Sequence, residues 1–138
     1  MDTNYTIEQI TTELTWNIRH QVLYPDLPLS SVHIEDDFSG VHFGLFGNNQ
    51  LIGVVSLFEK DDNIVFRNLA ISKEHQNKKL GSKLLNHIIE YAKKAGKKHI
   101  SCNARISAIN FYKKFGFQTT GNTFSRNGVD FLTIRKDL

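Results

Sequence analysis

Residues 67–82 lead from a strand through a polar loop into a helix. This deciding stretch reads Arg67-Asn68-Leu69-Ala70-Ile71-Ser72-Lys73-Glu74-His75-Gln76-Asn77-Lys78-Lys79-Leu80-Gly81-Ser82. A buried strand is predicted over residues 64–71, and a helix is predicted to begin near Ser82. The unpaired N–H groups at a helix N-terminus together carry about half a positive charge. The turn therefore predicts a phosphate-binding site, to which neighbouring lysines add charge.

Upstream of this stretch, the pattern predicts a helix and then a β-hairpin. The amphipathic helix is indicated by apolar residues at intervals of four, namely Ile10, Leu14, Ile18 and Val22. Residues 41–46 and 51–58 predict two strands of a hairpin around the turn Asn48-Asn49. The chain then turns into the third strand, which carries the deciding stretch.

Downstream, the hydrophobic period changes to that of helices. An apolar stripe over residues 84–92 indicates a helix that stops at Gly96, and residues 99–103 predict a short buried strand. A second short helix is predicted over residues 108–115, and two strands follow at 117–120 and 129–135. This order predicts an α/β (α+β mixed) fold with helices on the faces of a mixed sheet. Because no linker or repeat interrupts it, residues 1–138 are expected to form a single domain.

Composition and charge exclude several classes of protein. The net charge is +3 and the lysines occur in pairs, but the 14 acidic residues and the lack of interleaved aromatic residues argue against nucleic-acid binding. The polar start of the chain and the short apolar runs predict no secretory signal and no membrane span, which favours the cytoplasm. A single cysteine, Cys102, suits a reducing compartment, and the six histidines lack metal-ligand spacing, so no metal is expected.

The deciding stretch and the residues after it resemble the GNAT family of N-acetyltransferases. Gln76 and Gly81 match the outer positions of the family's Gln/Arg-x-x-Gly-x-Gly/Ala signature, whereas Lys79 replaces its middle glycine. Three further segments are similar to family motifs: Leu69-Ala70-Ile71, Asn103-Ala104-Arg105 and Ala108-Ile109-Asn110-Phe111-Tyr112-Lys113-Lys114-Phe115-Gly116-Phe117. The lysine is expected to keep an ordinary backbone conformation and, at most, to weaken cofactor binding.

The resemblance implies a mostly antiparallel sheet of about six to seven strands and a direct acetyl transfer from acetyl-CoA to an amine. It implies that the pantetheine arm of the cofactor lies along Leu69, Ala70 and Ile71. The residues around the pyrophosphate would be Gln76, Asn77, Lys78, Lys79, Leu80, Gly81 and Ser82. Asn103 and Asn110 would also bind the cofactor. Tyr112 is implied as the general acid, since a phenol with a pKa near 10 is protonated at neutral pH.

The acceptor is expected to be a small-molecule primary amine, with a free amino acid as the candidate. Arg19, His20 and Arg67 are candidate substrate-binding residues, because arginine pairs well with a carboxylate next to the amine. The base stays open among Glu35, Asp36, His42, Glu59 and a water relay. A coenzyme A-binding sensor or inactive subunit without turnover is the alternative function, and either a monomer or a homodimer is compatible with the sequence.

Overall fold

The sheet organises the whole molecule. The computed structural model describes residues 4–138, so the first three residues of the polar start lie outside the described part. Seven strands follow one another across the sheet in the order β1-β2-β3-β4-β5-β7-β6. Their bounds are β1 Tyr5–Ile10, β2 Val41–Gly47, β3 Gln50–Lys60, β4 Asn63–Ile71, β5 His99–Arg105, β6 Gln118–Arg126 and β7 Val129–Asp137. Only the pair β4 and β5 is parallel, which confirms the predicted mixed, mostly antiparallel sheet.

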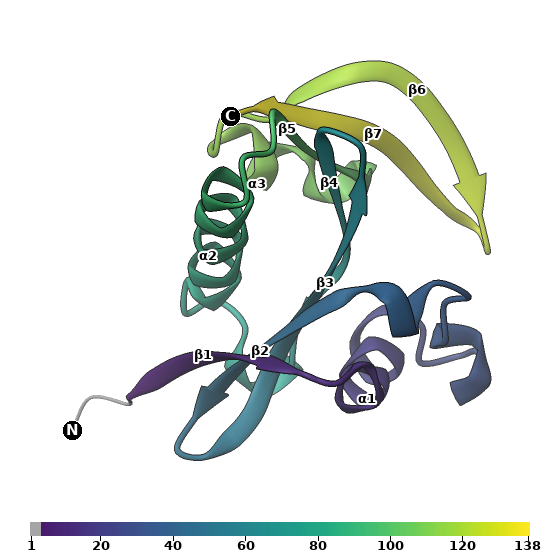
Figure 1. Cartoon of the computed structure of the whole chain (residues 1–138). Coiled ribbons are helices and arrows are strands. Elements are labelled where there is room, and N and C mark those ends of the chain that lie inside the picture. Colours follow the sequence, from purple (N-terminus) through teal and green to yellow (C-terminus); the bar gives the residue numbers. More distant parts are fainter. Residues whose placement is uncertain (1–3) are drawn as a thin grey trace.

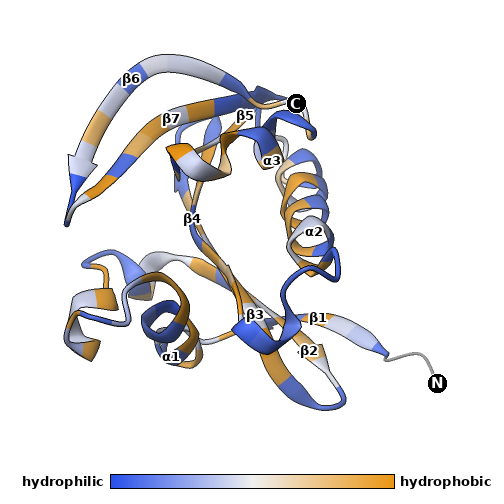
Figure 2. Ribbon diagram, turned by 180° about the vertical axis from the view of Figure 1, so that it is seen from behind, coloured by the Kyte–Doolittle hydropathy of each residue, from blue (hydrophilic) through white to orange (hydrophobic). Residues whose placement is uncertain are grey.

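Helices cover both faces of this sheet (Figure 1). The long helix α2 (Leu80–Lys94) and the short helix α3 (Ile109–Lys113) share one core with the strands. Helix α2 turns an apolar stripe toward the sheet and a polar face outward (Figure 2), as expected for an amphipathic helix at a surface. Within residues 4–138, no helix is long and apolar enough to cross a membrane.

The other face is covered by short helical turns instead of the predicted amphipathic helix. Ile10 ends strand β1, and the turns that follow are η1 Thr12–Thr15, α1 Trp16–Ile18 and η2 Arg19–Leu23. Leu14 is 51% exposed, so the four-residue spacing does not form one buried stripe. The β-branched residues of Tyr5–Ile10 favour extended structure, and pairing with β2 stabilises the strand. The prediction of a continuous helix was wrong.

The sheet splits between β4 and β5. These strands pair only over residues 63–65 of β4, where Asn63, Ile64 and Val65 lie opposite His99, Ile100 and Ser101. Further along, β4 contains a bulge at Asn68 and Leu69, and Asn68 has a left-handed φ of 57°. In Figure 1, strands β1–β3 form the lower half and β5–β7 the upper half, with β4 between them. Residues 66–71 of β4 therefore present an edge that β5 does not cover.

Candidate active site

The loop before α2 has an unusual backbone. Asn77 and Lys79 both adopt left-handed conformations, with φ of 65° and 62°. Left-handed residues within a turn direct successive N–H groups to one concave side, which makes an anion-binding nest. The expectation that Lys79 keeps an ordinary conformation was wrong, because the chain needs a left-handed residue at the entry of α2 and no glycine supplies it. This loop is strongly hydrophilic (Figure 2).

The loop is tied to the end of β4. The Gln76 side-chain amide donates a hydrogen bond to the Ile71 carbonyl oxygen over 2.9 Å. The first turn of α2 closes with the Lys83 N–H donating to the Lys79 carbonyl over 3.2 Å. Among the described residues, no side chain caps this helix start. The N–H groups of Leu80 to Ser82 thus belong to a helix start that is open to a ligand.

A hollow of about 710 Å³ lies at this helix start. Seven of the predicted cofactor residues line it, together with His75 and three side chains of α3 and the turn after it. The seven are Ile71, Gln76, Asn77, Lys79, Leu80, Gly81 and Ser82, and the three are Phe111, Lys114 and Phe115. A methyl group at Gly81 would lie 3.7 Å from the Phe111 ring and 3.9 Å from Ile71. Packing does not require a glycine at this position, so its bare backbone leaves room beside the hollow.

Tyr112 lies where β4 and β5 separate. Its ring is 5.8 Å from the ring of Phe66 on β4, 5.9 Å from Phe117 and 5.0 Å from Phe111. Burial raises the pKa of the Tyr112 phenol, and the nearby Cys102 on β5 raises it further. The hydroxyl is therefore fully protonated at neutral pH, which a general acid requires.

Arg19 does not face a cleft. It is completely buried, and its guanidinium donates to the Asp37 carboxylate over 2.9 and 3.0 Å, to the Val32 carbonyl over 2.9 Å and to the Ser56 hydroxyl over 2.7 Å. Its role is to hold residues 32–37 against β3. The prediction that Arg19 binds the substrate was wrong, because every partner of its guanidinium belongs to the protein itself.

Other predicted residues lie apart from the helix start. His20 donates from Nε2 to the Leu27 carbonyl over 2.7 Å and lines a separate hollow with Ser72 and His75. Arg67 and Asn103 line a third hollow, on the β6–β7 side. Asn110 is exposed on α3. The structure therefore gathers the loop residues into one place but does not bring His20 and Arg67 together.

The proposed bases are mostly engaged elsewhere. His42 is buried, and its Nε2–H donates to the Asp37 carbonyl over 2.7 Å, so its Nδ1 accepts from the Ser56 hydroxyl over 2.7 Å. Glu59 forms an ion pair with Lys97 over 3.7 Å. Neither Glu35 nor Asp36 lines the hollow that contains Arg67. The described residues thus place none of these four candidates in the hollow.

Sequence reasoning missed most of this third hollow, which has a volume of about 280 Å³. The hairpin of β6 and β7 contributes Phe124, Arg126, Asn127 and Phe131, and the turns before β2 contribute Tyr24, Leu27, Ser31, Val32 and Ile34. These segments are far apart in the sequence and carry no recognisable motif. The Asn127-Gly128 turn predicted where the hairpin lies in the sequence, but not that its side chains would face the turns before β2.

Comparison with known proteins gives a consistent picture. The family model described as "Acetyltransferase (GNAT) domain" matches residues 31–138. The chain is also similar to "Uncharacterized N-acetyltransferase YitI" of Bacillus subtilis, with 25% identity over 132 residues that cover 89% of each chain.

Several solved structures share the fold. A putative N-acetyltransferase from Lactobacillus plantarum has a TM-score of 0.85 at 18% identity, covering 97% of this chain and 98% of that one. An IAA acetyltransferase from Bacillus cereus has a TM-score of 0.78 at 22% identity, covering 98% and 100%. A GNAT family acetyltransferase from Elizabethkingia anophelis, solved with acetyl-CoA bound, has a TM-score of 0.77 at 22% identity, covering 98% and 99%.

Proposed function

The chain belongs to the GNAT family of N-acetyltransferases, and we propose that it transfers an acetyl group from acetyl-CoA to the primary amine of a small molecule. The observation that carries the proposal is the open edge of β4 beyond Val65. The loop of residues 76–82, whose N–H groups can bind a phosphate, lies at the end of this edge, and Tyr112 lies at its start. An extended ligand can pair with such an edge as an added strand. A free amino acid is our candidate acceptor.

Acetyl-CoA would supply the acetyl thioester, and backbone groups would hold most of it. We assign the pyrophosphate to the N–H groups of residues 76–82, where the left-handed Asn77 and Lys79 shape the nest. The pantetheine arm would run along Leu69, Ala70 and Ile71, with one N–H near the acetyl oxygen to polarise the carbonyl. Asn110 on α3 would add a side-chain contact.

Tyr112 would give its proton to the departing thiolate. The same apolar surroundings that raise the pKa of the phenol also raise the pKa of a thiol, as burial does for Cys102. A thiolate formed there is strongly basic and takes a proton readily. Acid and leaving group are therefore matched although the phenol is a weaker acid than in water.

The amine proton would leave through water. His42 is locked between the Asp37 carbonyl and the Ser56 hydroxyl, and the Glu59 carboxylate pairs with Lys97. Because the described residues offer no free carboxylate or imidazole in the hollow with Arg67, we propose a water relay in place of a protein base.

Replacement of Tyr112 by phenylalanine tests the proposal. We expect kcat to fall about 100-fold or more, the usual contribution of a general acid, with an unchanged dissociation constant for acetyl-CoA. Tyr91→Phe is the matched control, because Tyr91 lies on α2 and packs against Phe43 of β2, away from the strand split. Thiol release measures turnover and calorimetry measures binding. Acetyl-CoA binding without turnover with any amine would instead support the sensor or inactive subunit.

A further inference from the structure

The hollow between β4 and the β6–β7 hairpin is lined by side chains of several separate segments. It has a volume of about 280 Å³, near the lower end for small-molecule sites. Arg67 and Asn68 reach it from β4, Asn103 from β5 and Arg126 from β6. In Figures 1 and 2, the hairpin arches over the turns that precede β2.

The arginines of the protein divide into two groups. Arg19 is bound by Asp37, Arg105 donates to the Leu23 carbonyl over 2.6 Å, and Arg135 pairs with Asp137 over 3.5 Å. Among the described residues, the side chains of the other two arginines in the sequence have neither an ion pair nor a hydrogen bond. These two are Arg67 and Arg126, and both line the same hollow.

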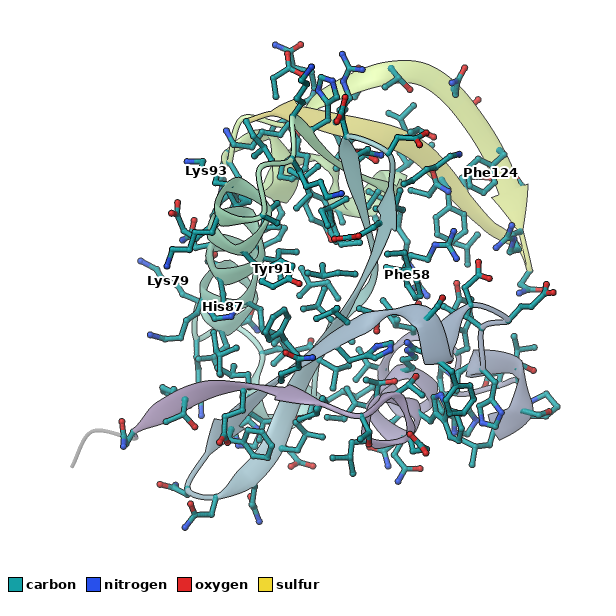
Figure 3. All side chains as sticks on the ribbon, in the orientation of Figure 1. Phe58, Lys79, His87, Tyr91, Lys93 and Phe124 are labelled. Atoms are coloured by element: carbon teal, nitrogen blue, oxygen red, sulfur yellow. The ribbon has the colours of Figure 1, made fainter. Side chains whose placement is uncertain are left out.

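Each of these two guanidinium groups lies over an aromatic ring, as that of Arg105 also does over Tyr24. The Arg67 guanidinium lies 5.1 Å from the centre of the Phe58 ring, and that of Arg126 lies 5.9 Å from the centre of Phe124. Phe124 itself stacks on Phe131, with ring centres 5.4 Å apart. Figure 3 labels Phe58 and Phe124 on the same side of the molecule. Stacking holds a guanidinium in place while its N–H edge stays free to donate.

The charge around the hollow has one sign. No acidic side chain is present among the described residues that line it, whereas two guanidinium groups are. A polyamine or another purely cationic acceptor would be repelled there. A carboxylate is a small anionic group that the planar donor fork of arginine fits with two parallel hydrogen bonds.

We propose that this hollow binds the acceptor and that Arg67 and Arg126 hold its carboxylate, so that the acceptor is an α-amino acid or a close analogue. The inference rests on the proposed acetyl transfer and adds Arg126 of the β6–β7 hairpin as a specificity-determining residue. The apolar walls formed by Phe124, Phe131 and Leu27 give the side chain of the acceptor a place to pack.

The two arginines would also prepare the amine for attack. The carboxylate of a free amino acid raises the pKa of its α-amino group, and pairing with arginine cancels most of that effect. The amine then approaches the value of about 8 that an α-amino group has without a neighbouring charge. At pH 7 roughly one molecule in ten is deprotonated, against fewer than one in a thousand for a lysine-like amine with a pKa of about 10.4. This removes the need for a protein base.

The chemical step balances without further groups. The neutral amine nitrogen bonds to the acetyl carbonyl carbon, and the carbon–sulfur bond breaks. The surplus proton of the nitrogen passes to water. The thiolate takes the proton of Tyr112, which the phenol later regains from solvent.

The test compares acceptors with and without a carboxylate. Acetylation of the proteinogenic amino acids is measured beside that of their α-carboxamides and spermidine, with the wild-type protein and with Arg67→Gln, Arg126→Gln and the control Arg135→Gln. We expect amino acids to be preferred, and kcat/KM for the best of them to fall about 10- to 100-fold in Arg67→Gln and Arg126→Gln, the range for a hydrogen bond between charged groups. Rates with the carboxamides should be low in the wild type, and Arg67→Gln and Arg126→Gln should not change them. Arg135→Gln should match the wild type with every acceptor.

The pH profile adds a readout that a merely structural arginine would not move. In the wild-type protein, kcat for the best amino acid should reach half its maximum at about pH 8, and this midpoint should rise in Arg126→Gln. Acetyl transfer that favours carboxamides or spermidine, that leaves every amino acid untouched, or that is insensitive to both arginine variants would overturn the acceptor assignment alone. Absence of acetyl-CoA binding and of all transfer would overturn the proposed function with it.

Discussion

The hollow at the start of α2 and the hollow under the β6–β7 hairpin are built in different ways. The hollow at the start of α2 is formed largely by one continuous segment, residues 71–82, and its main feature is backbone conformation. The hollow under the β6–β7 hairpin is formed by side chains from β4, β5, β6 and the turns before β2. Lys79 and Phe124 lie on opposite sides of the molecule (Figure 3). The proposed cofactor site can thus stay constant while the proposed acceptor site varies with a few side chains.

The two regions also differ in what stabilises them. The loop before α2 is held by local contacts such as the bond from Gln76 to the Ile71 carbonyl. In the hollow under the β6–β7 hairpin, the wall formed by Val32 and Ile34 depends on a buried network, because Asp37 accepts hydrogen bonds from Arg19, Trp16 and the Ile34 N–H. A substitution in the loop before α2 should therefore leave the wall formed by Val32 and Ile34 intact, and a substitution in the Asp37 network should leave the loop intact.

The largest effect is expected from Asp37→Asn. Both Asp37 and Arg19 are buried, so removing the carboxylate leaves the Arg19 charge without a partner and should cost about 3–5 kcal/mol of unfolding free energy. Urea denaturation measures this, with the exposed Asp36→Asn as control. In the folded fraction, KM for the amine should rise while acetyl-CoA affinity is kept. A loss no greater than that of Asp36→Asn would contradict this account of the acceptor wall.

The same carboxylate predicts a dependence of stability on pH. Burial alone would raise the pKa of Asp37, but hydrogen bonds from Arg19, Ile34 and Trp16 and the charge of Arg19 outweigh it and lower the pKa below 3.8. Its contribution to stability is therefore complete above about pH 4 and is lost as the pH falls through the lowered value. Acid titration of the unfolding free energy should show a shallower fall in Asp37→Asn than in the wild type. Equal slopes would refute this role.

Gln76→Glu should damage the other hollow. A carboxylate cannot donate to the Ile71 carbonyl, and it places a negative charge in the loop that would hold the pyrophosphate. We expect acetyl-CoA affinity to fall about 10- to 100-fold, the range for losing a charge-assisted contact, without a change in the KM of the amine. Gln118→Glu on the exposed strand β6 is the matched control. Equal affinities of the two variants would argue against a pyrophosphate in this loop.

The smallest effect is expected from Lys79→Gly. A non-glycine residue in the left-handed region costs about 1–2 kcal/mol of folding free energy, which glycine would recover. The greater freedom of glycine in the unfolded chain takes back about 0.5–1 kcal/mol of that stabilisation. Lys79 has φ of 62°, so the variant should be more stable by up to about 1.5 kcal/mol, whereas Lys78→Gly should show no gain. Acetyl-CoA affinity should fall only slightly, and less at high salt. A destabilised Lys79→Gly would show that the left-handed conformation is not strained.

Most strands and α2 could be predicted from the sequence because their signals are local. The turns at Asn48-Asn49 and Asn127-Gly128 and the stripe over residues 84–92 each follow from neighbouring residues. Strand β1 could not be predicted in this way, since its pairing with β2 lies more than 30 residues away in the chain. The spacing of Ile10 and Leu14 matched a helix by coincidence.

The candidate site shows the same division. The loop of residues 76–82 was recognisable because its chemistry comes from consecutive backbone groups, although the left-handed Lys79 was not foreseen. Arg19 and Arg67 have the same side chain, and only the fold separates them. Asp37 and Ser56 bind Arg19, whereas no residue within 4–138 forms a hydrogen bond or ion pair with the Arg67 side chain, which lies over Phe58. Arg126 had no signal at all, because its importance depends on where the hairpin places it.

A crystal structure of the complex with coenzyme A is the strongest test of the proposed cofactor site. It should show the pyrophosphate within hydrogen-bond distance of N–H groups between Gln76 and Ser82, the pantetheine arm beside residues 66–71 of β4, and the thiol next to the Tyr112 hydroxyl. Arg67 and Arg126 should stay free of the cofactor. A pyrophosphate bound at the two arginines, or a loop that remains empty while coenzyme A binds elsewhere, would contradict the proposed cofactor site.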